Sequence, residues 1–190
     1  TQAAERAYRA QQGQTGRLRT RLTVEEAAQL NWLPQETILY DGSALSRRLE
    51  VDITTTGRFL MVEPVLFGRR AMGERLESAI FRDRIDIRRD GELIYRDGLA
   101  LDGDIESRLD RPAIGGGARA MVSLVLVAPG AEGALTPVRD LIGQTGGASL
   151  LRSDVLAMRL LATDGFTLRQ RLVPLLDHLT RHTLPTSWRL

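Results

Sequence analysis

The sequence predicts a mainly β protein: an antiparallel β-sheet scaffold, in a stacked or helical β arrangement, with one or two α-helices near the C-terminus. Two observations lead to this prediction. Apolar and charged residues alternate at period two along much of the chain, which is typical of half-buried strands. A helical spacing of leucines is clear only within residues 167–182, close to the end of the sequence.

The first two strands are predicted at residues 17–24 and 45–53. In the first segment, one face holds Leu18, Thr20, Leu22 and Val24, and the other holds Arg17, Arg19 and Arg21. In the second segment, one face holds Leu45, Leu49, Val51 and Ile53, and the other holds Arg48, Glu50 and Asp52. Such strands bury one face and leave the other in water.

A β-hairpin is predicted within residues 79–101. Two apolar-rich runs flank Asp90 and Gly91, and Asp-Gly is a strong hairpin signal because a type I′ turn needs positive φ at both central residues. Further strands are expected at 30–40, 58–67, 120–128 and 154–163.

The leucines of residues 167–182 predict the terminal helix, with Thr167 as a possible N-cap and Pro174 as a possible kink. Shorter helical turns are possible at 70–78 and 137–144. The glycine-rich stretches are too short to separate domains, so a single domain is expected over residues 1–190.

Composition excludes several function classes. All 26 basic residues are arginine, but they are interleaved with 24 acidic residues and the formal net charge is only +2, so nucleic-acid binding is not expected. No cysteine is present, which removes disulfides and thiolate sites. No apolar run reaches the roughly 18 residues of a membrane span, and a cytoplasmic location without membrane association is expected.

Motifs for catalysis or cofactor binding are absent. The two histidines, His178 and His182, are spaced i, i+4 on the predicted terminal helix and could share a metal ion, or they could be ordinary solvated residues at a helix end.

Three acidic residues near the segment 63–74 raise a second question. Glu63, Glu74 and Asp83 could pair with the neighbouring residues Arg69, Arg70 and Arg84, form a polar passage for an ion, or act as catalytic acids. Gly68 and Gly73 allow a tight turn, which Glu63 and Glu74 could fix together with Arg69.

Five segments in order resemble the urease accessory protein UreD family, also called UreH. They read "TQAAERAYR" (1–9), "NWLPQETILYDGSALSRRLEVDI" (31–53), "EPVLFGRRAMGE" (63–74), "FRDRIDIRRDGELIYRDGLAL" (81–101) and "LPTSWR" (184–189). The positions that carry the resemblance are Thr1, Gln2, Ala3, Ala4, Tyr8, Arg9, Trp32, Leu33, Pro34, Gln35, Glu36, Glu63, Gly68, Arg69, Met72, Gly73, Glu74 and Asp83.

The resemblance implies a urease maturation factor rather than an enzyme. Such proteins act as scaffolds that link apo-urease to UreF and, through UreF, to the GTPase UreG, and they help to deliver nickel to the urease active site. Nickel would then be a transient cargo, with no tightly bound cofactor, and the metal-transit candidates would be Glu63, Glu74, Asp83, His178 and His182. The sequence differs from the family pattern in two respects: the family's usual N-terminal portion is expected to be missing, and the ending has Thr186 and Ser187 before Trp188.

Two alternatives remain from the residues themselves. A β-sheet enzyme could use paired carboxylates, which predicts a pocket where two acids converge with a raised pKa. An arginine-rich domain could instead bind a polyanion, which predicts an affinity that falls steeply with salt.

Overall fold

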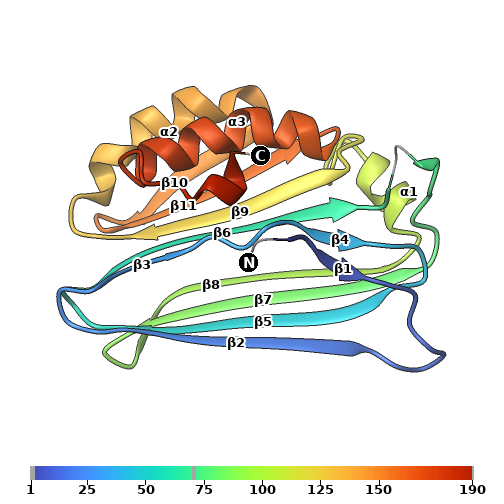
Figure 1. Cartoon of the computed structure of the whole chain (residues 1–190), viewed down its shortest axis with the longest axis horizontal. Coiled ribbons are helices and arrows are strands. Elements are labelled where there is room, and N and C mark those ends of the chain that lie inside the picture. Colours follow the sequence, from blue (N-terminus) through green and yellow to red (C-terminus); the bar gives the residue numbers. More distant parts are fainter. Residues whose placement is uncertain (1–2, 70–71, 190) are drawn as a thin grey trace.

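The computed structural model describes residues 3–69 and 72–189, and it has three layers. Two β-sheets face each other, and helices α2 (Leu135–Ile142) and α3 (Gly165–Leu179) cover the outer face of the larger sheet (Figure 1). No helix in these residues combines the length and apolar character needed to cross a membrane.

The smaller sheet has four strands and the larger one seven. The four-stranded sheet has the order β2 (Gly16–Val24), β5 (Ala44–Ile53), β7 (Ala79–Arg89) and β8 (Glu92–Gly103). The larger sheet has the order β1 (Glu5–Ala7), β4 (Thr37–Leu39), β6 (Arg58–Phe67), β9 (Ala120–Val127), β11 (Val155–Ala162) and β10 (Gly146–Arg152), and β3 (Gln29–Trp32) also pairs with β6.

The first half of the chain coils between the two sheets. After β2 the chain crosses to β3 and β4, returns to β5, crosses to β6 and returns to β7. Successive strands within one sheet therefore run parallel, as in the pairs β2–β5, β5–β7 and β4–β6. The pairs β1–β4 and β3–β6 are parallel as well, whereas β7–β8, β6–β9, β9–β11 and β10–β11 are antiparallel.

The structure confirms the predicted mainly β class and the α-helix near the C-terminus. It also has the expected stacked arrangement, in which the strands coil between two sheets. The sheets are mixed rather than antiparallel throughout, because side-chain alternation reveals which face of a strand is buried but not the direction of its neighbour. The predicted hairpin is also present: Asp90 and Gly91 connect β7 to β8 with φ of 48° and 85°.

The terminal helix differs from its prediction at the start. Its N-cap is Asp164 rather than Thr167, and the Asp164 carboxylate accepts a hydrogen bond of 2.7 Å from the Thr167 backbone N–H. Pro174 lies inside the helix, which continues to Leu179. The possible turn at 137–144 overlaps α2, whereas the one at 70–78 falls partly outside the described residues.

Several short elements were not predicted from the sequence. They are β1, β10, the helix α1 (Ile105–Asp110) and three 3₁₀ turns at Ala131–Ala134, Gly143–Thr145 and Thr186–Trp188.

Replacing Asp164 with alanine is expected to lower the free energy of unfolding by about 1 kcal/mol, because the first turn of α3 loses its capping carboxylate. Urea denaturation followed by circular dichroism measures the change. Asp140→Ala is the matched control. Because Asp140 is exposed on α2, this substitution should change the free energy of unfolding by less than about 0.5 kcal/mol. Equal effects of the two substitutions would contradict the capping role.

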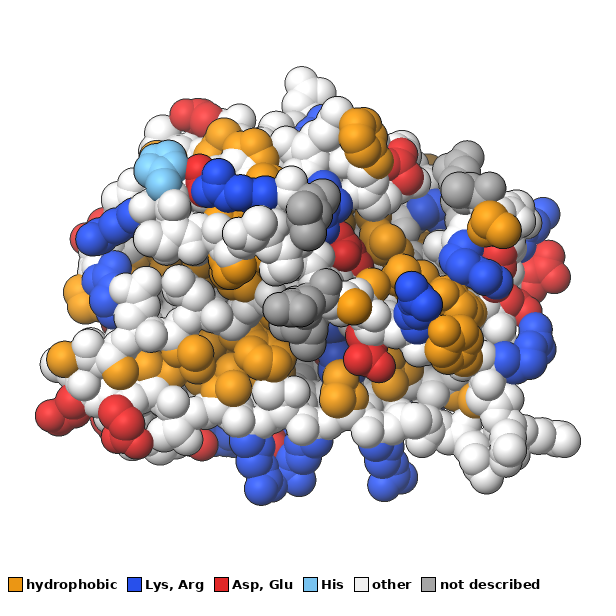
Figure 2. Space-filling model, in the orientation of Figure 1, with side chains coloured by type: hydrophobic (Ala, Val, Ile, Leu, Met, Phe, Trp, Pro, Cys, Tyr) orange, Lys and Arg blue, Asp and Glu red, His pale blue; other side chains and the backbone are white. Residues whose placement is uncertain are grey.

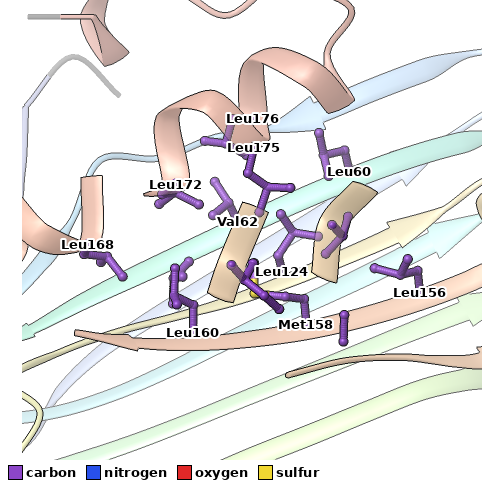
Figure 3. Packing of buried hydrophobic residues seen from close by; sticks show 14 of the residues in the cluster. Leu60, Val62, Leu124, Leu156, Met158, Leu160, Leu168, Leu172, Leu175 and Leu176 are labelled. Carbon is purple, nitrogen blue, oxygen red and sulfur yellow. The ribbon is translucent and has the colours of Figure 1, made fainter. Parts of the chain in front are cut away.

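The apolar core divides into three clusters. One lies between the helices and the larger sheet, where leucines of α3 such as Leu168, Leu172 and Leu176 meet Leu60 and Leu124 of the sheet (Figure 3). The other two lie between the sheets. The cluster that includes Met61 and Ile85 is called here the first inter-sheet cluster, and the one that includes Val65 and Phe81 is the second.

Candidate functional site

A row of polar side chains separates the two inter-sheet clusters and is called here the polar layer. On β6, Glu63 stands between Met61 of the first cluster and Val65 of the second, two residues away on either side. The same interruption of the inward face occurs on neighbouring strands. The polar layer comprises Arg47 of β5, Glu63 of β6, Asp83 of β7, Asp97 of β8, Ser123 of β9 and Arg159 of β11.

Arg47 holds one half of the polar layer together. Its Nε and Nη2 donate to the two carboxylate oxygens of Asp83 at 3.0 and 2.6 Å. Nη2 also lies 2.8 Å from Glu63 in the opposite sheet, and Nη1 donates to Thr37 Oγ1 at 3.1 Å. All four residues are buried, so this guanidinium links the two sheets by charge deep inside the protein.

The carboxyl group of Glu63 has a raised pKa. Burial raises its pKa and the charge of Asp83 adds to that effect, while Arg47 and the hydrogen bond from Trp32 act against it. Trp32 Nε1 donates to Glu63 Oε1 at 3.1 Å. Glu63 therefore holds a proton more readily than an exposed glutamate does.

The other half of the polar layer is built around Arg159. Its Nη2 forms an ion pair with Asp97 of the opposite sheet and contacts Ser123 Oγ at 3.3 Å. Ser123 lies opposite Glu63 in the β6–β9 register and opposite Arg159 in the β9–β11 register. The polar layer thus continues from one half to the other across adjacent strands. Two guanidiniums against three carboxylates give it a formal charge of −1 when all are ionised.

Surface hollows adjoin both ends of the polar layer. At the Glu63 end, a hollow of about 420 Å³ is lined by Asn31, Trp32, Leu33, Pro34, Thr183, Pro185 and Ser187. At the other end, Asp97 and Arg159 themselves line a hollow of about 290 Å³, together with Tyr95 and neighbouring residues. The interior polar groups therefore lie close to the surface on two sides.

The segments 31–36 and 184–189 meet at the first of these hollows. Trp188 Nε1 donates to the Leu33 carbonyl at 3.1 Å, and Gln35 Nε2 donates to the Ser187 carbonyl at 3.2 Å. Arg169 of α3 joins both segments, because it bonds Glu36 at 2.8 Å and the Trp188 carbonyl at 2.8 Å. Two motifs far apart in the sequence thus form one structural unit, which includes Trp32.

Glu74 has a different environment from Glu63. Its carboxylate pairs with Arg69 through two side-chain hydrogen bonds of 3.0 and 3.1 Å and also accepts the Arg69 backbone N–H at 3.0 Å. Gly68 and Gly73 have φ of 78° and 72°, as a tight turn requires. The turn is thus fixed by Glu74 and Arg69, as expected.

Two of the pairings expected from the sequence are wrong. Glu63 pairs with Arg47 rather than with Arg69 in the turn, because β6 directs it between the sheets. Asp83 pairs with Arg47 rather than with Arg84, since neighbouring residues of β7 point to opposite faces.

The other signature positions are spread over the surface near the N-terminus. Tyr8 packs edge-on against Tyr40, Arg9 forms an ion pair with Asp41 at 2.9 Å, and Met72 is exposed. Ala3 is exposed and Ala4 is half-buried. Thr1, Gln2 and Arg70 lie outside the described residues.

The two histidines do not share one face of a helix. Helix α3 ends at Leu179, and His182 follows it with φ of 63°. The two side chains are therefore not placed one helical turn apart, as their i, i+4 spacing predicted. His182 Nδ1 lies 2.7 Å from the carboxylate of Asp177. Within residues 3–69 and 72–189, no three or more His, Asp or Glu side chains are grouped to hold a metal ion.

Arg47, Asp97, Ser123 and Arg159 were not identified from the sequence as site residues. A usable signal was present, because each is a polar residue in phase with buried apolar neighbours on its strand. Arg47, for example, shares its face with Leu45 and Leu49. A charged residue at such a position must find a partner inside the fold.

Comparisons with known proteins agree with the resemblance read from the sequence. A family model described as UreD urease accessory protein matches residues 1–189. A protein named urease accessory protein UreD from Roseobacter denitrificans is 60% identical over the whole chain, which covers 70% of that relative. Relatives of the same name from Ruegeria sp. and Mesorhizobium japonicum are 52% and 46% identical, and the whole chain aligns to 67% and 69% of their lengths.

Proposed function

The chain belongs to the UreD family of urease accessory proteins, and on this basis we propose that it is a scaffold for nickel delivery to urease. It links apo-urease to UreF and, through UreF, to the GTPase UreG. Nickel is a transient cargo that passes between these partners, and the chain itself catalyses no reaction.

The polar layer is the observation that supports a nickel path through this protein. It provides carboxylates inside an otherwise apolar sandwich, and hollows adjoin it on two sides. When all of its charged groups are ionised, its net charge of −1 favours a cation, whereas an uninterrupted apolar core would exclude one. The path would run from Trp32 and Glu63, past Arg47 and Ser123, to Asp97 and Arg159.

Weak coordination suits a path better than a storage site. Histidine-rich sites hold Ni²⁺ firmly, while isolated carboxylates and hydroxyls bind it less strongly. In the polar layer each carboxylate is already paired with a guanidinium, so an incoming cation competes with Arg47 or Arg159. That competition keeps nickel mobile.

The buried carboxylates fit the enzyme alternative less well. Glu63 and Asp83 converge and Glu63 has a raised pKa, but both bind the same guanidinium and are shielded from solvent. A general acid or base must reach its substrate within hydrogen-bond distance. The ion-paired arrangement is therefore better suited to transit than to proton transfer.

Replacing Glu63 with glutamine is expected to lower the rate of nickel loading of urease about tenfold, because one charged contact worth about 1.4 kcal/mol is lost from the path. The measurement uses purified apo-urease, UreF, UreG, GTP, bicarbonate and nickel, with the metal content of urease followed over time. Complex formation is checked in parallel by size-exclusion chromatography.

Glu74→Gln is the matched control. Glu74 fixes a surface turn and lies outside the polar layer, so loading should be unchanged as long as the complex assembles. Normal loading by Glu63→Gln in a fully assembled complex would refute the path through the polar layer. Failure of the wild-type chain to bind UreF or apo-urease would refute the scaffold role.

A further inference from the structure

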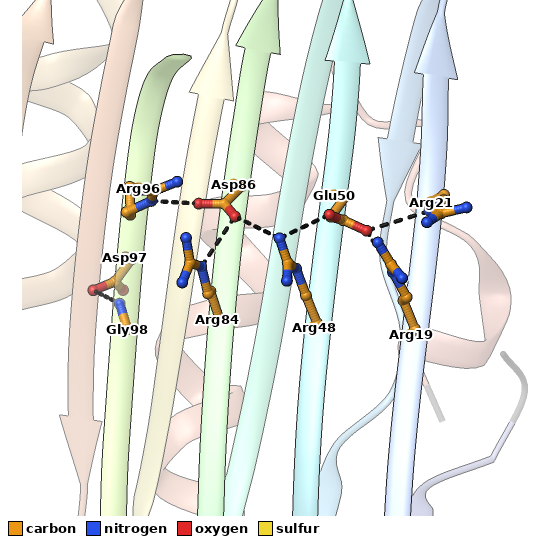
Figure 4. Close-up of polar contacts among 9 residues, drawn as sticks. All are labelled: Arg19, Arg21, Arg48, Glu50, Arg84, Asp86, Arg96, Asp97 and Gly98. Atoms are coloured by element: carbon orange, nitrogen blue, oxygen red, sulfur yellow. Dashed lines mark hydrogen bonds and ion pairs between the residues drawn. The ribbon is translucent and has the colours of Figure 1, made fainter.

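The outer face of the four-stranded sheet carries an ordered row of charges, away from both the core and the polar layer. Five guanidiniums from four strands alternate with two carboxylates (Figure 4). The arginine row is defined here as Arg19 and Arg21 of β2, Arg48 of β5, Arg84 of β7 and Arg96 of β8. The two carboxylates are Glu50 of β5 and Asp86 of β7.

Ion pairs fix the arginine row in place. Glu50 binds Arg19 at 2.6 Å, Arg21 at 3.3 Å and Arg48 at 2.9 Å. Asp86 binds Arg84 at 3.0 Å, Arg96 at 2.6 Å and Arg48 at 3.3 Å, so Arg48 joins the two groups. The row is therefore continuous from β2 to β8.

The arginines are much more exposed to solvent than the two acids. The side chains of Glu50 and Asp86 are 14% and 0% exposed, whereas those of the arginine row are 40–70% exposed. Five positive and two negative charges leave +3 on this row, against +2 for the whole chain. The hydrogen bond from Arg19 lowers the pKa of Glu50 to about 2, so its charge is constant at neutral pH.

The rest of the face has the same sign. Its outward positions carry eight arginines and four carboxylates, a surplus of +4. The arginines are Arg17, Arg19, Arg21, Arg48, Arg82, Arg84, Arg88 and Arg96, and the acids are Glu50, Asp52, Asp86 and Asp102. Figure 2 shows arginine side chains projecting from the outer side of this sheet.

Stability alone does not account for such a surface. Exposed ion pairs contribute little to folding, and five cations placed close together repel one another. Arg19, Arg21, Arg84 and Arg96 use Nε for their hydrogen bonds to the internal carboxylates. These four side chains are also 45–70% exposed, so their terminal nitrogens can donate to an external acceptor, and the planar guanidinium suits a carboxylate.

We propose that the arginine row docks a protein partner through an acidic surface on that partner. Arg19, Arg48 and Arg84 lie directly opposite one another on adjacent strands, whose backbones are about 4.8 Å apart, so the row presents closely spaced cations to a set of carboxylates on a folded protein. Because ion pairs already hold them, little side-chain entropy is lost on binding. The inference rests on the proposed function in one respect: the partner is a component of the urease assembly.

A protein partner fits better than nucleic acid or a lipid surface. The face has no aromatic side chain among its outward positions in β2, β5, β7 and β8, so bases would find no stacking platform. Asp52 and Asp102 on the same face would repel phosphate groups. A patterned surface of this kind selects a complementary protein surface.

The test is the double variant Arg19→Gln, Arg96→Gln. It removes two charges of the arginine row but leaves Glu50 with Arg21 and Arg48, and Asp86 with Arg84 and Arg48, so the fold should be kept. The matched control is Arg111→Gln, Arg181→Gln, which removes two exposed charges elsewhere. Thermal unfolding confirms that all proteins are folded.

Binding is measured by titration calorimetry against purified UreF, the UreF–UreG complex and apo-urease at low and physiological salt. The row variant should bind one of these partners about tenfold more weakly than wild type, with a shallower salt dependence, and the control should bind within about twofold. Equal binding of the row variant and wild type to every partner would overturn the inference.

Poly-L-glutamate separates this inference from the proposed function. The wild-type chain should bind it, and the row variant should bind it less. If no urease component binds the wild-type chain, the proposed function fails, and the poly-L-glutamate result still decides the docking surface. Row-dependent binding to a DNA duplex or to phosphatidylserine vesicles that exceeds binding to poly-L-glutamate would also overturn the acidic-protein assignment.

Discussion

Replacing Arg47 with methionine is expected to lower the free energy of unfolding by about 3–5 kcal/mol, because Glu63 and Asp83 would be left buried without their shared counter-charge. Denaturation by urea, followed by tryptophan fluorescence, measures the loss. The effect should be among the largest of any single substitution, since Arg47 connects both sheets.

The matched control is Arg21→Met, at a position that is 70% exposed and, within the described part of the chain, forms an ion pair with Glu50 alone, at 3.3 Å. Its effect should stay within about 0.5 kcal/mol. A triple variant with Arg47→Met, Glu63→Gln and Asp83→Asn should recover part of the lost stability, because no buried charge remains. An Arg47→Met protein as stable as wild type would refute the central role of this ion pair.

Glu63→Gln should lower the free energy of unfolding less than Arg47→Met does, because Arg47 keeps its two hydrogen bonds to Asp83.

The raised pKa of Glu63 also makes the stability of the protein depend on pH. Above the ordinary value of 4.5 the folded protein holds this proton more tightly than the unfolded chain, so Glu63 makes stability fall as pH rises through the raised pKa. The glutamine variant should lack this decline.

Replacing Trp188 with alanine is expected to cost about 3–5 kcal/mol of stability. The side chain is 1% exposed, donates to the Leu33 carbonyl at 3.1 Å and lies beneath the guanidinium of Arg169. Its removal would open a cavity and release the C-terminal segment from residues 31–36. Thermal and urea unfolding both report the change.

Phe166→Ala is the control for Trp188, because Phe166 is a large aromatic residue that is 73% exposed, and its loss should cost less than about 0.5 kcal/mol. Trp188→Phe should fall between the two, at about 1–3 kcal/mol, since it keeps apolar contact but leaves the Leu33 carbonyl unpaired. If Trp188→Ala matched the control, the anchoring role would be wrong.

Much of the fold could be predicted because strand patterns are local. The strand predicted at 58–67 has those bounds in the structure, and the Asp90-Gly91 hairpin follows from the backbone angles that the turn demands. Strands β1 and β10 were missed because three residues, or a glycine-rich segment such as 146–152, show little alternation. The N-cap of α3 was misplaced by three residues, since both Asp164 and Thr167 are good caps.

The candidate site was harder to predict from the sequence than the fold. Glu63 and Asp83 were singled out from the sequence, but their common partner Arg47 was not. Fifteen or more residues separate Arg47 from each of them, and only the coiled path of the chain brings β5, β6 and β7 together. The expectation that His178 and His182 lie on one helix face is wrong for the opposite reason. Their spacing is local, but the helix ends before His182.

By itself, the sequence determined the mainly β class, the principal strands, the hairpin and the family, because these depend on side-chain order along the chain. Tertiary structure alone decided the strand directions, the pairing of Arg47 with carboxylates from both sheets, and the joining of the arginine row across four strands. The physical reason is that an ion pair forms between side chains that lie close together in the folded protein. Which side chains do so depends on how strands that are distant in the sequence are stacked.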